Sequence, residues 1–100
     1  MQFTATQMTM LAQQLTKGRH PIEIGNHYAR LNNLEGKEAL ALRGAATAIL
    51  NGEDVTALLA EGETWDRPEG IPSPQQVTDD YLGRMEKRKR DRARRRGDAP

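Results

Sequence analysis

Cysteine is absent from the 100 residues of this chain. Its absence excludes disulfide bonds, zinc–thiolate sites, iron–sulfur clusters and thiol nucleophiles. It also fits a reducing compartment, so we expect a cytoplasmic protein. The sequence lacks any apolar run of membrane-spanning length, and its N-terminus lacks the basic and apolar segments of a signal peptide. We therefore expect a soluble protein that does not engage a membrane.

Aromatic residues are scarce, with one Trp, two Tyr and one Phe. A hydrophobic core must therefore be built mainly from Leu, Ala, Ile and Met, which are typical of helical bundles. The chain has the length of one ordinary domain with a modest core. The sequence predicts an all-α fold, with a small bundle of four or five helices over residues 1–85 and a basic extension over residues 86–100.

Capping motifs and apolar periodicity predict where the helices lie. Thr4 and Gln7 have the spacing of a capping box, in which each side chain bonds a backbone N–H at the helix start. Ser73 and Pro74 give the last helix a similar start, with Gln76 as the capping-box partner. The predicted helices cover residues 5–17, 22–32, 35–51, 54–61 and 74–85, and residues 62–73 are a predicted loop.

Apolar residues at helical spacing predict which faces are buried. The predicted faces consist of Met8, Leu11, Ala12 and Leu15, then Ile24, Tyr28 and Leu31, and then Leu42, Ala45, Ala46, Ile49 and Leu50. A second face of helix 35–51 has only the small residues Ala41, Gly44, Ala45 and Ala48. Small residues let another backbone approach closely, so we expect this helix to be central.

The net charge of +1 conceals a strong asymmetry. Residues 1–83 contain six basic and eleven acidic side chains, which gives a net charge of −5. Residues 84–100 contain nine basic and three acidic side chains, which gives +6. The chain is thus an acidic body followed by a basic segment, and we call residues 86–100 the basic arm.

The basic segment is the strongest candidate for a binding site. Nucleic acid is the commonest polyanion, and arginine can bind phosphate through two parallel hydrogen bonds. Repulsion between such dense like charges favours a frayed or disordered arm when no polyanion is bound. No aromatic side chain interrupts the run, so a stacking platform for single strands is not expected. The candidate nucleic-acid-binding residues are Arg84, Lys87, Arg88, Lys89, Arg90, Arg92, Arg94, Arg95 and Arg96. An acidic protein partner, or no role beyond solubility, stays open as an alternative.

Three other residues are candidates for a protein interface. Trp65 lies in a loop rich in Pro and Gly, where it either caps an edge of the bundle or presents an anchor to a partner. Tyr81 and Met85 follow the apolar stripe of the last helix. They belong to the core if that helix docks on the bundle, and to an interface if it does not. The same face could also close a homodimer.

Residues that could support catalysis or bind a metal are few. Glu23 and His27 are four residues apart and could present two ligands on one helical face, but a closed metal site needs about four ligands. We therefore expect His20 and His27 to be exposed or to cap a helix. The sequence has no glycine-rich phosphate loop, nucleophile elbow or supported carboxylate pair. These absences predict a non-enzymatic protein without a metal or cofactor.

The combined features predict an accessory protein. We expect its basic arm to engage nucleic acid or a nucleoprotein complex while its acidic body contacts a larger protein. The alternative is a small inhibitor or adaptor of the type made by viruses and mobile elements, such as an anti-defence inhibitor or a virion assembly factor. Such a protein would act by occupying a surface of a larger complex.

Overall fold

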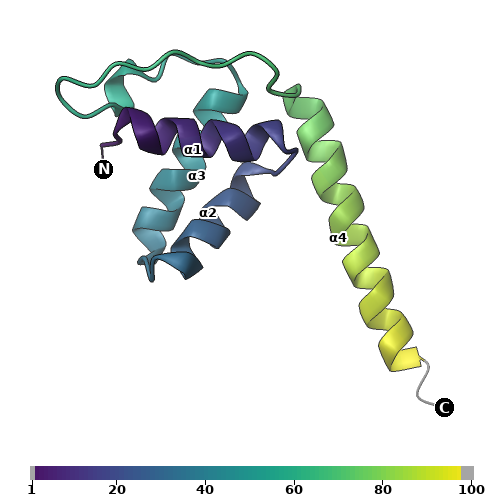
Figure 1. The fold of residues 1–100 in the computed structure, drawn as a ribbon. Coiled ribbons are helices and arrows are strands. Elements are labelled where there is room, and N and C mark those ends of the chain that lie inside the picture. Colours follow the sequence, from purple (N-terminus) through teal and green to yellow (C-terminus); the bar gives the residue numbers. More distant parts are fainter. Residues whose placement is uncertain (1, 98–100) are drawn as a thin grey trace.

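The structure, a computed structural model, describes residues 2–97, and it describes side chains as far as Arg94. It contains helices α1 (Ala5–Thr16), α2 (Pro21–Leu31), α3 (Gly36–Leu50) and α4 (Pro74–Gly97), with a short 3₁₀ helix η1 (Thr56–Leu58). These residues form no strand, and an isolated bridge joins Phe3 to Leu59. The predicted all-α fold is confirmed. Figure 1 shows α1, α2 and α3 gathered into a body, while α4 leads away from it.

Local capping bonds explain where α1 and α2 begin. Thr4 Oγ1 accepts the N–H of Gln7 at 3.1 Å, and Gln7 Oε1 accepts the N–H of Thr4 at 2.8 Å, which is the predicted capping box. His20 caps α2, where its Nδ1 accepts the N–H of Ile22 at 3.1 Å. Pro21 then occupies the first turn of α2, where its lack of an N–H costs nothing. The prediction that His20 caps a helix is therefore confirmed.

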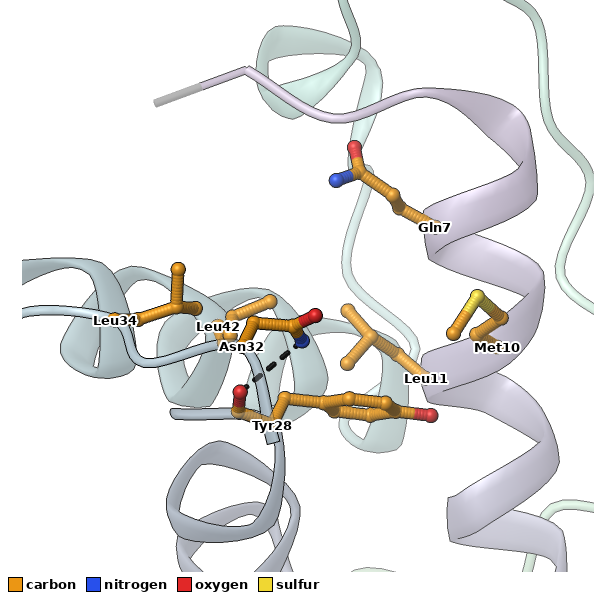
Figure 2. Close-up of a pocket in the computed structure, with 7 residues that line it drawn as sticks. All are labelled: Gln7, Met10, Leu11, Tyr28, Asn32, Leu34 and Leu42. Atoms are coloured by element: carbon orange, nitrogen blue, oxygen red, sulfur yellow. Dashed lines mark hydrogen bonds between the residues drawn. The ribbon is translucent and has the colours of Figure 1, made fainter. Parts of the chain in front are cut away.

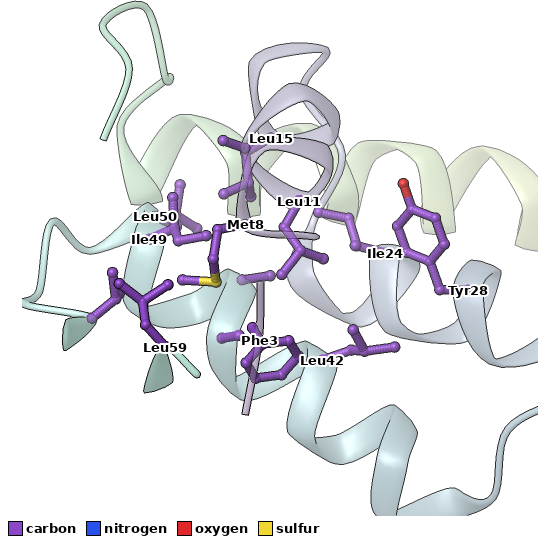
Figure 3. Packing of buried hydrophobic residues seen from close by; sticks show 14 of the residues in the cluster. Phe3, Met8, Leu11, Leu15, Ile24, Tyr28, Leu42, Ile49, Leu50 and Leu59 are labelled. Atoms are coloured by element: carbon purple, nitrogen blue, oxygen red, sulfur yellow. The ribbon is translucent and has the colours of Figure 1, made fainter. Parts of the chain in front are cut away.

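The core is apolar and lies where α1 crosses α2 and α3 (Figure 3). The predicted buried faces of α1 and α3 are all buried. Phe3 is also buried, because its backbone is bound on both sides: its N–H donates to Leu58 and its carbonyl accepts from Ala60, each at 2.8 Å. No polar or charged side chain is buried in the described part of the chain. Apolar burial is therefore the main stabilising contribution to the body.

Helices α2 and α3 approach each other closely at Gly25 of α2. A Cβ at Gly25 would overlap the Cγ of Arg43 and lie 3.0 Å from the carbonyl oxygen of Ala39, both in α3. At Gly44, by contrast, an added Cβ would meet nothing within 4 Å. Gly44 itself is thus not at a helix contact, but the expectation that α3 is central is confirmed, since α3 packs against both α1 and α2. The small residue at the contact between α2 and α3 therefore belongs to α2.

Two predicted elements differ from the structure near turns. Leu31 is 68% exposed, contrary to its predicted place on the buried face of α2. The helix ends there, because Asn32 is its C-cap and Asn33 turns the chain with a φ of 54°. The predicted helix 54–61 is reduced to η1, since the backbone next to Leu59 pairs with Phe3 and becomes extended.

Helix α4 is longer than predicted. The apolar stripe ends at Met85, yet the helix continues to Gly97, so the residues expected to be frayed or disordered are helical through that residue. Arg, Lys, Glu and Ala all have high helix propensity, which does not require burial. Glu86 and Arg90, and likewise Lys87 and Asp91, have the four-residue spacing at which opposite charges stabilise a helix. Residues 98–100 of the basic arm lie outside the described residues.

Candidate nucleic-acid interface

Helix α4 begins on the body and then leaves it. Ser73 caps its first turn, and the Oγ of Ser73 accepts the N–H of Gln76 at 3.1 Å. Val77 is fully buried and belongs to the common core. From Met85 to Arg94, every side chain is exposed. Residues 86–97 span about 18 Å at the rise of an α-helix. The molecule is consequently elongated, with extents of 61 × 29 × 15 Å (Figure 1).

Three residues, His20, Glu23 and Arg84, make polar contacts that join α4 to the body. We call this group of residues the latch. The Nε of Arg84 donates to Oε2 of Glu23 at 3.2 Å, and a second guanidinium nitrogen bonds the other carboxylate oxygen. That nitrogen also donates to the carbonyl of Gly18 at 3.1 Å. Oε1 of Glu23 accepts the backbone N–H of His20 at 3.0 Å. The Glu23 side chain is only 17% exposed, so solvent screens this ion pair less than a surface pair.

Aromatic stacking adds to the latch. The ring centroids of His20 and Tyr81 lie 4.5 Å apart, with an angle of 25° between the ring planes. The Tyr81 side chain is half-buried by this contact. Val77, Tyr81 and Arg84 are spaced so that they share one face of α4. Of the two alternatives that the sequence left open for Tyr81, the structure shows the one in which the last helix docks on the body.

The electrostatics of the latch favour a neutral His20 and charged Glu23 and Arg84. Burial lowers the pKa of His20, and Arg43 and Arg84 lower it further, while Glu23 acts in the opposite direction. Burial alone would raise the pKa of Glu23, but hydrogen bonds from Arg84 and from the His20 backbone leave it below its usual value. The hydrogen bond to Glu23 raises the pKa of Arg84.

The cationic residues of the basic arm are presented to solvent. Those with described side chains are all exposed: Lys87, Arg88, Lys89, Arg90, Arg92 and Arg94. Arg88 lies closest to the body, with 3.9 Å between its guanidinium and Oε2 of Glu23. Arg95 and Arg96 belong to α4, but their side chains lie outside the described residues. Arg84 differs from the rest of the predicted set, because its guanidinium is engaged in the latch.

The other predicted interface residues lie in two different settings. The Nε1 of Trp65 donates to Oγ1 of Thr9 at 3.1 Å, and its ring packs against the core. Trp65 thus covers an edge of the body next to α1. Met85 is 45% exposed and Leu82 is 53% exposed, and both line a shallow hollow formed by α4 alone. Tyr81 lies at the body end of that hollow.

The body has a second concave feature, which the sequence did not predict. A hollow of about 370 Å³ opens between α1, α2 and α3 (Figure 2). Its lining consists of Gln7, Met10, Leu11, Tyr28, Asn32, Leu34 and Leu42. Met10 is 41% exposed at its rim, and the Nδ2 of Asn32 donates to the Tyr28 carbonyl at 3.1 Å. Because three helices and the turn between α2 and α3 supply these residues, no single stretch of sequence indicates the hollow.

Neither a metal site nor a membrane-spanning helix occurs in the described residues, and the chain matches none of the known proteins compared with it. Within residues 2–97, no group of three or more His, Asp or Glu residues could hold a metal ion. None of the helices in this range combines the length and the apolar character needed to cross a membrane. Comparisons with protein-family models and with curated proteins find no match to the chain. A comparison with solved structures likewise finds no match.

Proposed function

We propose that this protein is a non-enzymatic accessory protein that binds nucleic acid or a nucleoprotein complex through the basic arm. The observation that supports this function is the position of the cations on α4, which extends past the body and exposes each described side chain from Met85 to Arg94. A phosphate backbone can therefore reach these cations, of which Arg88 is the one that also pairs with the body in the described residues, with 3.9 Å between its guanidinium and Oε2 of Glu23. The latch anchors α4 to the body just before the arm begins.

Binding of this kind has a characteristic dependence on salt. Each phosphate that a cation neutralises releases counterions, so affinity falls as salt rises. If about five phosphates are neutralised, the logarithm of the association constant falls with the logarithm of salt concentration with a slope of about −4 to −5. The acidic body, with its net charge of −5, would contact a protein partner and not the phosphates.

The test compares two variants of the full chain that lose the same charge. In the first, Lys87, Lys89, Arg92 and Arg94 are replaced by Gln, which keeps high helix propensity. In the matched control, the exposed body residues Lys17, Arg19, Arg30 and Lys37 are replaced by Gln. Fluorescence anisotropy with labelled DNA and RNA at low salt should show binding by the wild type and the control. The arm variant should lose binding while its melting temperature stays unchanged.

Three results would contradict the proposal. The first is a wild-type protein that binds neither DNA nor RNA at low salt. The second is equal weakening by the arm variant and the control, which would assign any binding to overall charge. Retention of binding by the arm variant would likewise place the contact elsewhere in the chain.

A second candidate function is that of a small adaptor or inhibitor that occupies a surface of a larger complex. The hollow between α1, α2 and α3 supports it, because the apolar walls suit an apolar side chain of a partner. A pull-down from nuclease-treated native lysate, with wild type and Met10→Glu compared, would test this function. A protein that the wild type retains and Met10→Glu loses would favour it, and loss of all capture on nuclease treatment would favour nucleic-acid bridging.

A further inference from the structure

Five cations in the exposed part of α4 form two rows on opposite sides of the helix, and Arg88 lies between the rows on the side of the body. Lys87, Arg90 and Arg94 are spaced at i, i+3 and i+7, which puts them in one row. Lys89 and Arg92 are spaced at i and i+3 in a second row. At 3.6 residues per turn, the two rows point about 160° apart around the helix axis. The arm therefore presents positive charge to two sides at once.

A narrow ridge with little positive charge separates these rows. Glu86 and Ala93 are seven residues apart and lie midway between the rows in the α-helical repeat. Ala93 is the one apolar residue in the arm before Gly97, and its small side chain permits a close approach of another molecule. Both residues are exposed. The ridge is thus a strip without positive charge between the two cationic rows.

The ridge faces away from the body. The latch residue Arg84 and its neighbour Arg88, which lies 3.9 Å from Glu23, both point toward α2. In the helical repeat these residues lie on the side opposite to Glu86 and Ala93. A large ligand seated on the ridge therefore meets no part of the body. Asp91 lies on the body side, so its carboxylate is kept away from such a ligand.

We infer that the basic arm binds B-form duplex DNA by lying in the major groove, with one cationic row against the phosphates of each strand and the ridge of Glu86 and Ala93 on the groove floor. The inference rests on the proposed function and names its nucleic acid. A major groove about 12 Å wide admits an α-helix and has a phosphate wall on each side, which matches two opposed rows. The major groove of A-form RNA is too narrow for side chains to enter, and single strands favour aromatic stacking, which the arm lacks.

The groove arrangement assigns a role to the ridge residues. Ala93 lets the helix axis approach the base edges, where a larger side chain would hold it away. Glu86 faces the floor and not a phosphate, and a carboxylate in that position can accept a hydrogen bond from the amino group of cytosine. The body stays outside the groove, because the arm is the part of α4 that extends away from the body (Figure 1).

The first test removes one row at a time from the full chain. Lys87→Gln with Arg94→Gln, and Lys89→Gln with Arg92→Gln, each remove two positive charges from opposite sides of α4. Anisotropy titrations use a labelled duplex DNA of mixed sequence, an RNA duplex of the same sequence, and the single DNA strand. The wild type should bind the DNA duplex at least about tenfold more tightly than the other two probes. Each pair of substitutions should weaken duplex binding to a similar degree and reduce the salt slope by about 2.

The second test fills the ridge. Ala93→Leu keeps the charge and the helix propensity, and should weaken DNA duplex binding about fivefold or more while single-strand binding is unchanged. Asp91→Leu puts the same side chain on the body side and should not weaken duplex binding. Three results would overturn the groove assignment while the proposed function stands. They are equal affinity for the three probes, weaker duplex binding in only one of the two row variants, and unchanged duplex binding in Ala93→Leu. Absence of binding to every probe would instead overturn the proposed function.

Discussion

The guanidinium of Arg84 in α4 binds the carboxylate of Glu23 in α2, 61 residues earlier in the chain. The same carboxylate accepts the N–H of His20 and so completes the cap of α2. One acidic side chain thus serves the start of one helix and the docking of another. The direction of the basic arm is consequently coupled to the N-terminus of α2.

Loss of the charge on Glu23 should weaken the docking of α4. Glu23→Gln keeps an oxygen that can accept the His20 N–H, but it removes the charged partner of Arg84. We expect the free energy of unfolding to fall by about 1.5 kcal/mol, the lower end of the usual range for a hydrogen bond to a charged group, because the Arg84 side chain is 38% exposed. Urea denaturation measures this change. Glu53→Gln, a substitution at an exposed position, is the control and should leave the unfolding midpoint unchanged. Equal midpoints for the two variants would show that the latch does not stabilise the fold.

Stability should depend on pH through His20. Burial lowers the folded-state pKa of His20, so the unfolded chain takes up a proton first as the pH falls. Its stabilising contribution is therefore complete above the unfolded-state value of about 6.5 and is lost as the pH falls below it. The structural reason is that a protonated Nδ1 cannot accept the N–H of Ile22. Unfolding measured between pH 7 and pH 5 should show this loss.

Two substitutions isolate the effect of His20. His20→Asn keeps an N-cap acceptor that does not titrate, so the loss of stability between pH 7 and pH 5 should largely disappear. His27→Asn, on the exposed side of α2, should retain it. Glu23 acts in a separate window, because its lowered pKa gives a contribution that is lost only below about pH 4.3. An unchanged pH profile in His20→Asn would show that another group is responsible.

Features that depend on neighbours in sequence could be predicted from the sequence. The caps formed by Thr4 with Gln7 and by Ser73 with Gln76 join residues three apart, so their side chains meet wherever the helix forms. The buried faces of α1 and α3 follow from helical periodicity for the same reason. The end of α4 was misplaced because the prediction relied on apolar residues, whereas the arm continues as a helix through its intrinsic propensity.

Features that depend on how helices pack could not be predicted. Nothing near Glu23 or Arg84 in the sequence distinguishes this pair from other acidic and basic residues, because their contact requires α4 to return to the start of α2. The hollow at Met10 has the same origin, since three helices and the turn between α2 and α3 supply its walls. The close approach at Gly25 was also missed, because small residues on α3 offered an equally good site until the packing was known.

Two glycines in helices should respond in opposite ways to the same substitution. Gly44→Ala should raise the free energy of unfolding by about 1 kcal/mol, because alanine is the better helix former and the added Cβ meets nothing within 4 Å. Gly25→Ala should lower it by about 1 to 3 kcal/mol, because the fixed carbonyl of Ala39 lies 3.0 Å from the added Cβ. Thermal melts of the two variants provide the comparison. Stabilisation by Gly25→Ala would mean that α2 and α3 separate more easily than their packing indicates.

Gly83 lies between the docked part of α4 and the basic arm, where an added Cβ would meet nothing within 4 Å. Gly83→Ala should favour the helical conformation at this position by about 1 kcal/mol, because alanine has a higher helix propensity than glycine. If the arm binds as a preformed helix, less ordering is required on binding, and affinity for nucleic acid should rise by up to about fivefold. Gly44→Ala is the control, because the same exchange in α3 should raise the melting temperature and leave affinity unchanged. An unaltered affinity in Gly83→Ala, measured by anisotropy at fixed salt, would show that continuity of α4 does not limit binding.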